Sequence, residues 1–424
     1  MNAPERLAAT DAPRISIAIN NLRGIVVLLV VAVHSVLAYL WTLPPEPYAF
    51  DKPPFAWRTF AIVDPHHFIG FDILCAWANV FLMPLFFLIS GLFVWQSLER
   101  NGPIDFVYRR WLRLGLPFLF GVLVLMPLAV FPTYLQTAAH PGIADFWHHW
   151  FALPFWPAGP MWFLWVLLIG DVAAAMCFGL FSGLRERVFR LSGYAQRRPV
   201  QSFGGILLVS ALAYIPMGVA FDPMAWFHKG PFSFQLSFPG LYAAYFCAGI
   251  VVGARALDGS SIAGSLARHW KSWTAASAVS FPIWLLVSAK AFVNPATASP
   301  EWNLASAVAL VPACLASSCC VLALTLRFAR SRTPAMDSLQ RNSYAIYLTH
   351  CVFVIWAQFA LLELAWPAVV KAPIVFVMTL MLSWMSAVAL RRLPLLETII
   401  GVGPRVRASI LPPLRSRPVL PVPD

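Results

Sequence analysis

Two ionisable side chains stand inside an otherwise apolar run, at residues 21–36 with the sequence NLRGIVVLLVVAVHSV. Arg23 lies near its beginning and His34 near its end. Both are costly among lipid tails, so such residues are functional candidates. On a helix their separation is about three turns, which places them on nearly one face, ~16 Å apart along the axis. A neutral His34 could act as a general base, with Arg23 as a fixed cation three turns away. Alternatively, backbone carbonyls and neighbouring helices satisfy both.

A second basic group stands in YRRWLRLGLPF, residues 108–118. Arg110 and Arg113 are three residues apart, so they share a face of a helix. The guanidinium fork binds phosphate through two parallel hydrogen bonds, which makes this pair a candidate phosphate site. Arg109 stands beside them. The alternative is a set of positive anchors at a membrane boundary, and this explanation suits Arg109 best.

A third group stands in NSYAIYLTH, residues 342–350. Ser343, Tyr347 and His350 have the spacing of one helical face and would form a polar stripe in a span. A core histidine with a tyrosine partner explains the pattern equally well. A carboxylate in or next to a span could orient an imidazole, and the sequence offers Asp72, Asp171 and Glu363.

Aromatic residues crowd residues 145–165, DFWHHWFALPFWPAGPMWFLW. Such rings stack on sugars, but tryptophan also collects at membrane interfaces, which favours an interfacial belt here.

The adjacent histidine pairs are weak evidence of metal, and we assign no metal site; they are His66–His67 and His148–His149. The seven cysteines fall in apolar stretches without the spacing of zinc ligands, which indicates packing residues.

The composition places the chain in a membrane. Of its 424 residues, 60% are hydrophobic and 11% charged, whereas soluble domains have about 45–50% and about 25%. No charged stretch is long enough for a soluble domain. The sequence therefore predicts an all-α, polytopic integral membrane protein with about ten transmembrane helices. The predicted spans are 15–40, 69–97, 107–132, 159–182, 203–221, 236–255, 272–294, 304–328, 342–364 and 370–391.

The basic residues alternate along these spans. Of the 30 Lys and Arg residues, 25 fall at the termini, at the start of the first span or in loops on one side. The positive-inside rule then places both termini in the cytoplasm and explains the net charge of +12 without a nucleic-acid partner. We predict a cytoplasmic tail over 1–14, a membrane domain over 15–391, and a Pro- and Arg-rich cytoplasmic tail over 392–424.

Several blocks resemble the membrane acyltransferase 3 family, in the order expected for it. They are RGIVVLLVVAVH with the pattern R-x10-H, MPLFFLISGLF, RRWLRLGLPF, MWFLWVLL and NSYAIYLTH. The resemblance spans most of residues 15–365. Within the family, the blocks look most like the branch that contains the membrane succinyltransferase of periplasmic glucan synthesis.

This resemblance implies an enzyme that takes an acyl group from cytoplasmic acyl-CoA to a hydroxyl, usually of a carbohydrate, at the outer face of the bacterial inner membrane. It implies that His34 and Arg23 are catalytic and that Arg110 and Arg113, with Arg109, bind acyl-CoA. Ser343, Tyr344, Tyr347 and His350 fall in a supporting block. Many members carry an aspartate before the arginine; this chain has Asn20 and Asn21.

The physical argument agrees with the resemblance. Arginines at the cytoplasmic rim could hold the anionic head of coenzyme A while its arm brings the thioester towards His34. We expect acyl-CoA as a co-substrate, a glycan or other hydroxyl acceptor, the bilayer as surroundings, and no permanently bound cofactor. No serine or cysteine nucleophile stands out, which favours direct transfer. The alternative is a multispan transporter of a small anionic or sugar-like solute, although no internal repeat is found.

Overall fold

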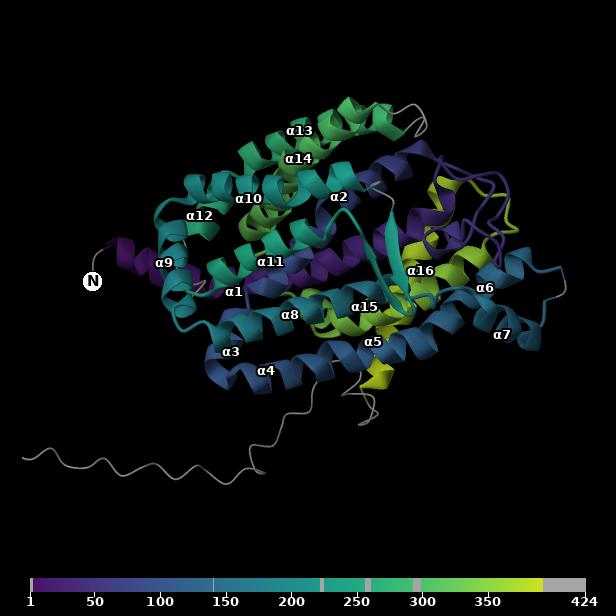
Figure 1. Ribbon diagram of the computed structural model, residues 1–424, viewed down its shortest axis with the longest axis horizontal. Helices are drawn as coiled ribbons and strands as arrows, with labels where there is room; N and C mark the ends of the chain where they lie inside the picture. Colours follow the sequence, from purple (N-terminus) through teal and green to yellow (C-terminus); the bar gives the residue numbers. More distant parts are fainter. Residues whose placement is uncertain (1–2, 140, 222–224, 256–260, 293–298, 392–424) are drawn as a thin grey trace, which may run out of the picture.

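Long apolar helices make up the molecule, as the sequence predicts. The computed structural model describes residues 3–139, 141–221, 225–255, 261–292 and 299–391. The predicted tail over 392–424 lies outside these residues, and the predicted tail over 1–14 is part of the first helix from Ala3 onward. The helices run side by side along one common direction, which is horizontal in Figure 1. The all-α prediction is confirmed.

Within the described residues, nine helical segments are long and apolar enough to cross a membrane. Each lies within a few residues of a predicted span. Their helices are α1 (Ala3–Val36), α2 (Ile69–Gly91) with α3 (Val94–Asn101), α4 (Pro103–Arg110) to α6 (Met126–Thr137), α8 (Trp162–Leu180), α10 (Pro199–Ala220), α13 (Trp270–Phe292), α14 (Pro300–Phe328), α15 (Pro334–Ala360) and α16 (Ala368–Leu390).

The remaining predicted span, 236–255, corresponds to α11 (Pro239–Gly253), which is shorter than the other nine. Its 15 residues extend ~22 Å, less than the ~30 Å of a bilayer core. The ends of the bundle nevertheless indicate ten crossings. Asn21 of α1 contacts Gln340, and Arg391, directly after α16, donates to the carbonyl of Arg341. The first span thus begins on the side of the membrane where the last span ends. This arrangement needs an even number of crossings.

Glycines explain how the short helix α11 fits. A Cβ at Gly249 would stand 2.2 Å from the Leu88 carbonyl oxygen, and one at Gly253 would stand 2.0 Å from that of Leu92. Only glycine allows the backbones of α2 and α11 to approach this closely. α11 is therefore held against α2 along its length.

The segment from α4 to α6 is interrupted by two π-helical turns, Trp111–Gly115 and Gly121–Leu125, around α5 (Leu116–Phe120). Pro117 and Pro132 have no N–H to donate to the carbonyls four residues earlier. Side chains of α15 replace these donors: Tyr344 donates to the carbonyl of Arg113 (2.5 Å) and Trp356 Nε1 to that of Leu128 (2.9 Å). The irregular segment is thereby tied to α15 at two heights.

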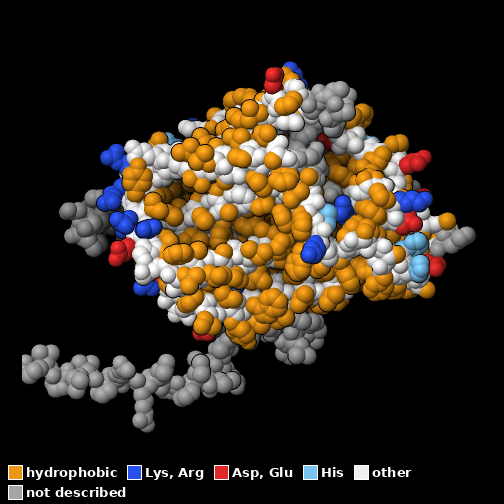
Figure 2. All heavy atoms as spheres, viewed as in Figure 1, with side chains coloured by type: hydrophobic (Ala, Val, Ile, Leu, Met, Phe, Trp, Pro, Cys, Tyr) orange, Lys and Arg blue, Asp and Glu red, His pale blue; other side chains and the backbone are white. Residues whose placement is uncertain are grey.

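The core lies around α1, which packs against both α14 and α15, while α8, α10, α13 and α16 present apolar side chains outward. Figure 2 shows this apolar surface, with Lys and Arg side chains gathered at the end where α9 (Leu184–Arg197) and α12 (Ser261–Arg268) lie. We call this the basic end. The opposite end carries the loop of residues 40–68, α7 (Ile143–Ala152) and a hairpin of β1 (Trp226–Lys229) and β2 (Phe232–Gln235). The hairpin was not predicted.

Candidate active site

Helix α1 carries Arg23 and His34 along one continuous rod. The helix has no proline or break between residues 14 and 36, so its geometry places the two side chains ~16 Å apart along the axis and nearly on one face. Arg23 lies towards the basic end, and its guanidinium carbon is 4.2 Å from the centre of the Phe93 ring. His34 lies in the last turn, towards the opposite end.

Hydrogen bonding fixes which nitrogen of His34 is free. The Nδ1 atom lies 2.8 Å from the carbonyl oxygen of Val30. A carbonyl only accepts, so Nδ1 must carry the hydrogen. In the neutral ring Nε2 is therefore unprotonated and able to accept a proton. This is the protonation state that a general base requires.

His350 of α15 lies directly against His34. The two ring centres are 4.9 Å apart, with the ring planes at 75°. His350 Nδ1 lies 2.5 Å from the carbonyl oxygen of Tyr347, and its buried Nε2 has no hydrogen-bond partner among the described residues. The Tyr347 hydroxyl donates to the carbonyl of Pro160. The structure thus joins two of the predicted groups, His34 and His350, in one place.

Gln358 of α15 holds the end of α1. Its side-chain nitrogen donates to the carbonyls of His34 (2.9 Å) and Ser35 (3.3 Å). Carbonyls in the last turn of a helix lack partners within the helix, and Gln358 supplies one from outside. The contact fixes the position of His34 along the axis of α15.

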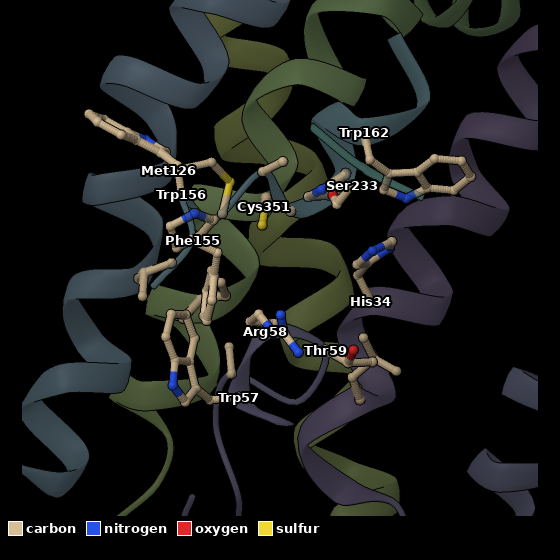
Figure 3. Close-up of a pocket in the computed structure, with 18 of the residues that line it drawn as sticks. His34, Trp57, Arg58, Thr59, Met126, Phe155, Trp156, Trp162, Ser233 and Cys351 are labelled. Carbon is tan, nitrogen blue, oxygen red and sulfur yellow. The ribbon is translucent and has the colours of Figure 1, made fainter. Parts of the chain in front are cut away.

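His34 lines a cavity of about 230 Å³. One water takes ~30 Å³ in the liquid, so the cavity has room for a substrate group. Aromatic rings form much of its wall, and Figure 3 shows them around His34 together with Arg58 and Thr59. They come from distant parts of the chain: Trp57, Phe155, Trp156, Trp162 and Trp226.

Two further polar side chains reach this cavity from the end opposite the basic end. Arg58 comes from the loop before α2, and His228 comes from β1, where it is paired with Ser233. Burial, and then the positive charge of Arg58, lower the pKa of His228 to about 4. His228 is therefore neutral at pH 7 and can donate or accept a hydrogen bond.

Arginines form a cluster on the other side of His34, towards the basic end. Arg110 Nε lies 3.3 Å from a carboxylate oxygen of Asp171, whose side chain is 1% exposed. Arg110 and Arg113 lie close enough to Arg23 for their charges to act on it. Three cations thus share one carboxylate among the described residues, and the surplus charge suits an anion.

Comparison with known families gives one match. The model of an acyltransferase domain, Acyl_transf_3, matches residues 16–388, which is most of the chain. The chain belongs to the acyltransferase 3 family. The match does not distinguish branches of the family, so the resemblance to the glucan succinyltransferase branch stays a prediction. Comparisons with curated proteins and with solved structures find no match.

As a member of this family the protein is a membrane acyltransferase, and its remaining predicted residues can be placed. Arg109 is exposed on α4, and Ser343 donates to the carbonyl of Gln340 in its own helix. Among the described residues, neither side chain hydrogen-bonds to His34 or His350. Asn21, one of the two asparagines before Arg23, is buried and donates to the carbonyls of Ala329 and Ser331. It ties α1 to the loop after α14.

In the described part of the chain, none of the candidate carboxylates Asp72, Asp171 and Glu363 hydrogen-bonds to His34. Asp72 accepts hydrogen bonds from the backbone of Trp41 and Thr42 and so fixes the turn after α1. Glu363 is exposed, and Asp171 pairs with Arg110. Among the described residues, no group of three or more His, Cys, Asp or Glu could hold a metal.

Several residues that line the acyltransferase cavity were not among the predicted site residues, above all Arg58, Thr59, His228 and Gln358. Phe155, Trp156 and Trp162 lie within the aromatic stretch that the sequence assigned to an interfacial belt, and they line the cavity. Trp147 and Phe151 of the same stretch are exposed. A basic residue between aromatic ones in the outer loop, AWRTF, was the one available signal for Arg58.

Proposed function

We propose that this acyltransferase moves an acyl group from cytoplasmic acyl-CoA to a hydroxyl of a carbohydrate acceptor at the outer face of a bacterial inner membrane, with both termini in the cytoplasm. One observation carries the proposal. His34, with a free Nε2, stands at an aromatic cavity, and Arg23 of the arginine cluster lies ~16 Å away along the same helix. The charged head of acyl-CoA could be held at the arginines, and its thioester could be held at the cavity beside His34.

In the proposed reaction Arg23 and Arg113 bind phosphates of coenzyme A, and the thin arm of the donor extends towards His34. Arg110 contributes less charge, because Asp171 neutralises it. Aromatic rings such as Trp156 and Trp162 cover the face of a sugar and leave its hydroxyl beside the imidazole.

The chemical step then needs one base. His34 Nε2 takes the proton of the acceptor hydroxyl while the oxygen attacks the thioester carbonyl carbon. The tetrahedral intermediate collapses, the carbon–sulfur bond breaks, and the imidazolium returns the proton to the departing thiolate. The His350 ring lies against His34, with 4.9 Å between the ring centres, so the imidazolium forms beside a second imidazole.

Cys351 lines the same cavity and is the candidate for a covalent alternative. Its side chain is 6% exposed, in an apolar cluster with Val354 and Met126. Direct transfer predicts that Cys351→Ala retains acyl transfer, since no thioester forms on the protein. An inactive, folded Cys351→Ala variant that still binds donor would favour an acyl-enzyme.

The test of the proposed function uses the purified chain in lipid nanodiscs. Acyl-CoAs of different length are supplied with oligosaccharide acceptors, and both thiol release and acyl transfer are measured. We expect thiol release that depends on the acceptor and on His34. Absence of thioester turnover with every pair, for a protein that remains folded, would contradict the proposal.

A further inference from the structure

Arg58 is a cation at the edge of the cavity that holds His34. It lies in the short helical turn Ala56–Arg58, in the loop between α1 and α2. Its guanidinium carbon is 4.5 Å from the centre of the Phe155 ring, and its Nε donates to the carbonyl of Phe55 (3.1 Å). These two contacts leave the outer edge of the guanidinium, with both Nη atoms, available to a ligand. Figure 3 shows the side chain among the aromatic rings at the cavity.

No acidic side chain of the described residues pairs with Arg58. Two carboxylates of the same loop are engaged elsewhere: Asp64 pairs with Lys371 (2.6 Å) and Asp51 lies 3.9 Å from His149. The third, Glu46, is exposed. Charged groups removed from water are paired or bind a charged ligand. An arginine that lines a substrate cavity without a carboxylate partner therefore has room for an anion.

The surroundings of Arg58 favour a strong contact with an anion. Burial lowers the pKa of the Arg58 guanidinium, because a buried charge loses hydration. His228 stays neutral beside it, so Arg58 supplies the positive charge at this edge of the cavity. The Arg58 side chain is partly buried against Phe155, and away from bulk water a charge-assisted hydrogen bond is stronger than in solvent.

We propose that Arg58 binds a carboxylate carried by one of the substrates and so selects anionic substrates over neutral ones. The proposal rests on the proposed function, because it takes the cavity at His34 as the place where the substrates meet. A carboxylate can come from two sources. It could end the transferred acyl chain, which would pass His34 and reach Arg58, or it could belong to the carbohydrate acceptor.

The test compares matched substrates that differ in one carboxylate. Succinyl-CoA is compared with butyryl-CoA as donor, and an oligosaccharide with a uronic acid is compared with the corresponding neutral sugar as acceptor. Each pair is assayed with the wild-type protein, Arg58→Gln and Arg58→Lys in nanodiscs. The control is Lys229→Gln, which removes an exposed cation of the hairpin that does not line the cavity.

For Arg58→Gln we expect the ratio of kcat/KM, anionic over neutral substrate, to fall ~10–100-fold in one of the two comparisons, because a bidentate charge-assisted contact is lost. A fall in the donor comparison assigns the carboxylate to the acyl chain, and a fall in the acceptor comparison assigns it to the sugar. Arg58→Lys should lose less, because it keeps the charge, and Lys229→Gln should keep both ratios. Ratios that stay constant in both comparisons overturn the proposal.

Binding measurements separate this proposal from the proposed function. Succinate is compared with succinamide, and glucuronate with glucose, by the shift in melting temperature of the wild-type protein and of Arg58→Gln. If no pair of substrates turns over, the proposed function fails, but a melting shift by one anion that depends on Arg58 still supports the anion site. Equal shifts in both proteins overturn it.

Discussion

Replacing His34 by Gln or Asn tests whether this imidazole is a base or a packing residue. Asn can place its amide nitrogen near the position of Nδ1 and still donate to the carbonyl of Val30, but it has nothing at the position of Nε2. Gln reaches the position of Nε2, but its amide cannot take a proton at neutral pH. The two variants therefore preserve different contacts and lack the same chemical function.

The structure sets the size of both effects. Loss of a general base costs a factor of ~10²–10⁴ in turnover, which raises the barrier by ~2.7–5.4 kcal/mol. Stability should change much less. The ring makes one hydrogen bond, worth ~0.5–1.5 kcal/mol, and one edge contact with His350, worth ~0.5–1.5 kcal/mol.

The assay measures folded yield, acyl-CoA binding and acyl transfer for His34→Gln and His34→Asn in nanodiscs. His148→Gln is the control, because His148 is an exposed histidine of α7. We expect both His34 variants to fold and bind donor but to lose transfer by the factor given above. Transfer by His34→Gln within a few-fold of wild type would refute the assignment of His34 as the base.

Three further predictions follow from other parts of the molecule. Arg113→Lys keeps the charge but loses the planar fork, so the apparent KM for acyl-CoA should rise ~10-fold; a KM equal to that of the control Arg187→Lys, on exposed α9, would contradict the donor site. Lys371→Met leaves Asp64 buried without its cation, both side chains being 0% exposed, and should cost ~3–5 kcal/mol of stability. Adding Asp64→Asn should restore most of the lost melting temperature, and an unchanged melting temperature in the single variant would count against the pair. A reporter fused to the C-terminus should report the cytoplasm, and a periplasmic signal would contradict the assigned topology.

The spans could be predicted because composition alone decides them: apolar stretches of this length have no other stable environment. The local geometry of the helices that form these spans could not be predicted. The short helix α11 depends on close contact between Gly249 and the backbone of α2, and the π-helical turns depend on donors from α15 such as Tyr344. Both are contacts between segments far apart in the sequence, and neither leaves a periodic signal.

The candidate site, too, could be predicted only in part. Arg23 and His34 were predictable because one helix carries both, and the helical repeat gives their relation directly. The contact between His34 and His350 was not predictable, since it depends on how α1 and α15 pack. Arg58 lies in a loop with little regular structure, where the sequence gives no geometry. The pairing of Arg110 with Asp171 depends on the packing of α4 against α8.

Helix α1 is unbroken, so it fixes the distance between Arg23 and His34. Each residue between Arg23 and His34 adds 1.5 Å and turns the chain by about 100°, so the spacing is set by a count of residues rather than by the shape of a loop. One inserted residue would rotate His34 away from the cavity, while four would return it to nearly the same face but ~6 Å further along. If the donor binds as proposed, with its head at Arg23 and its thioester at His34, a donor arm of another length would not place the thioester at His34.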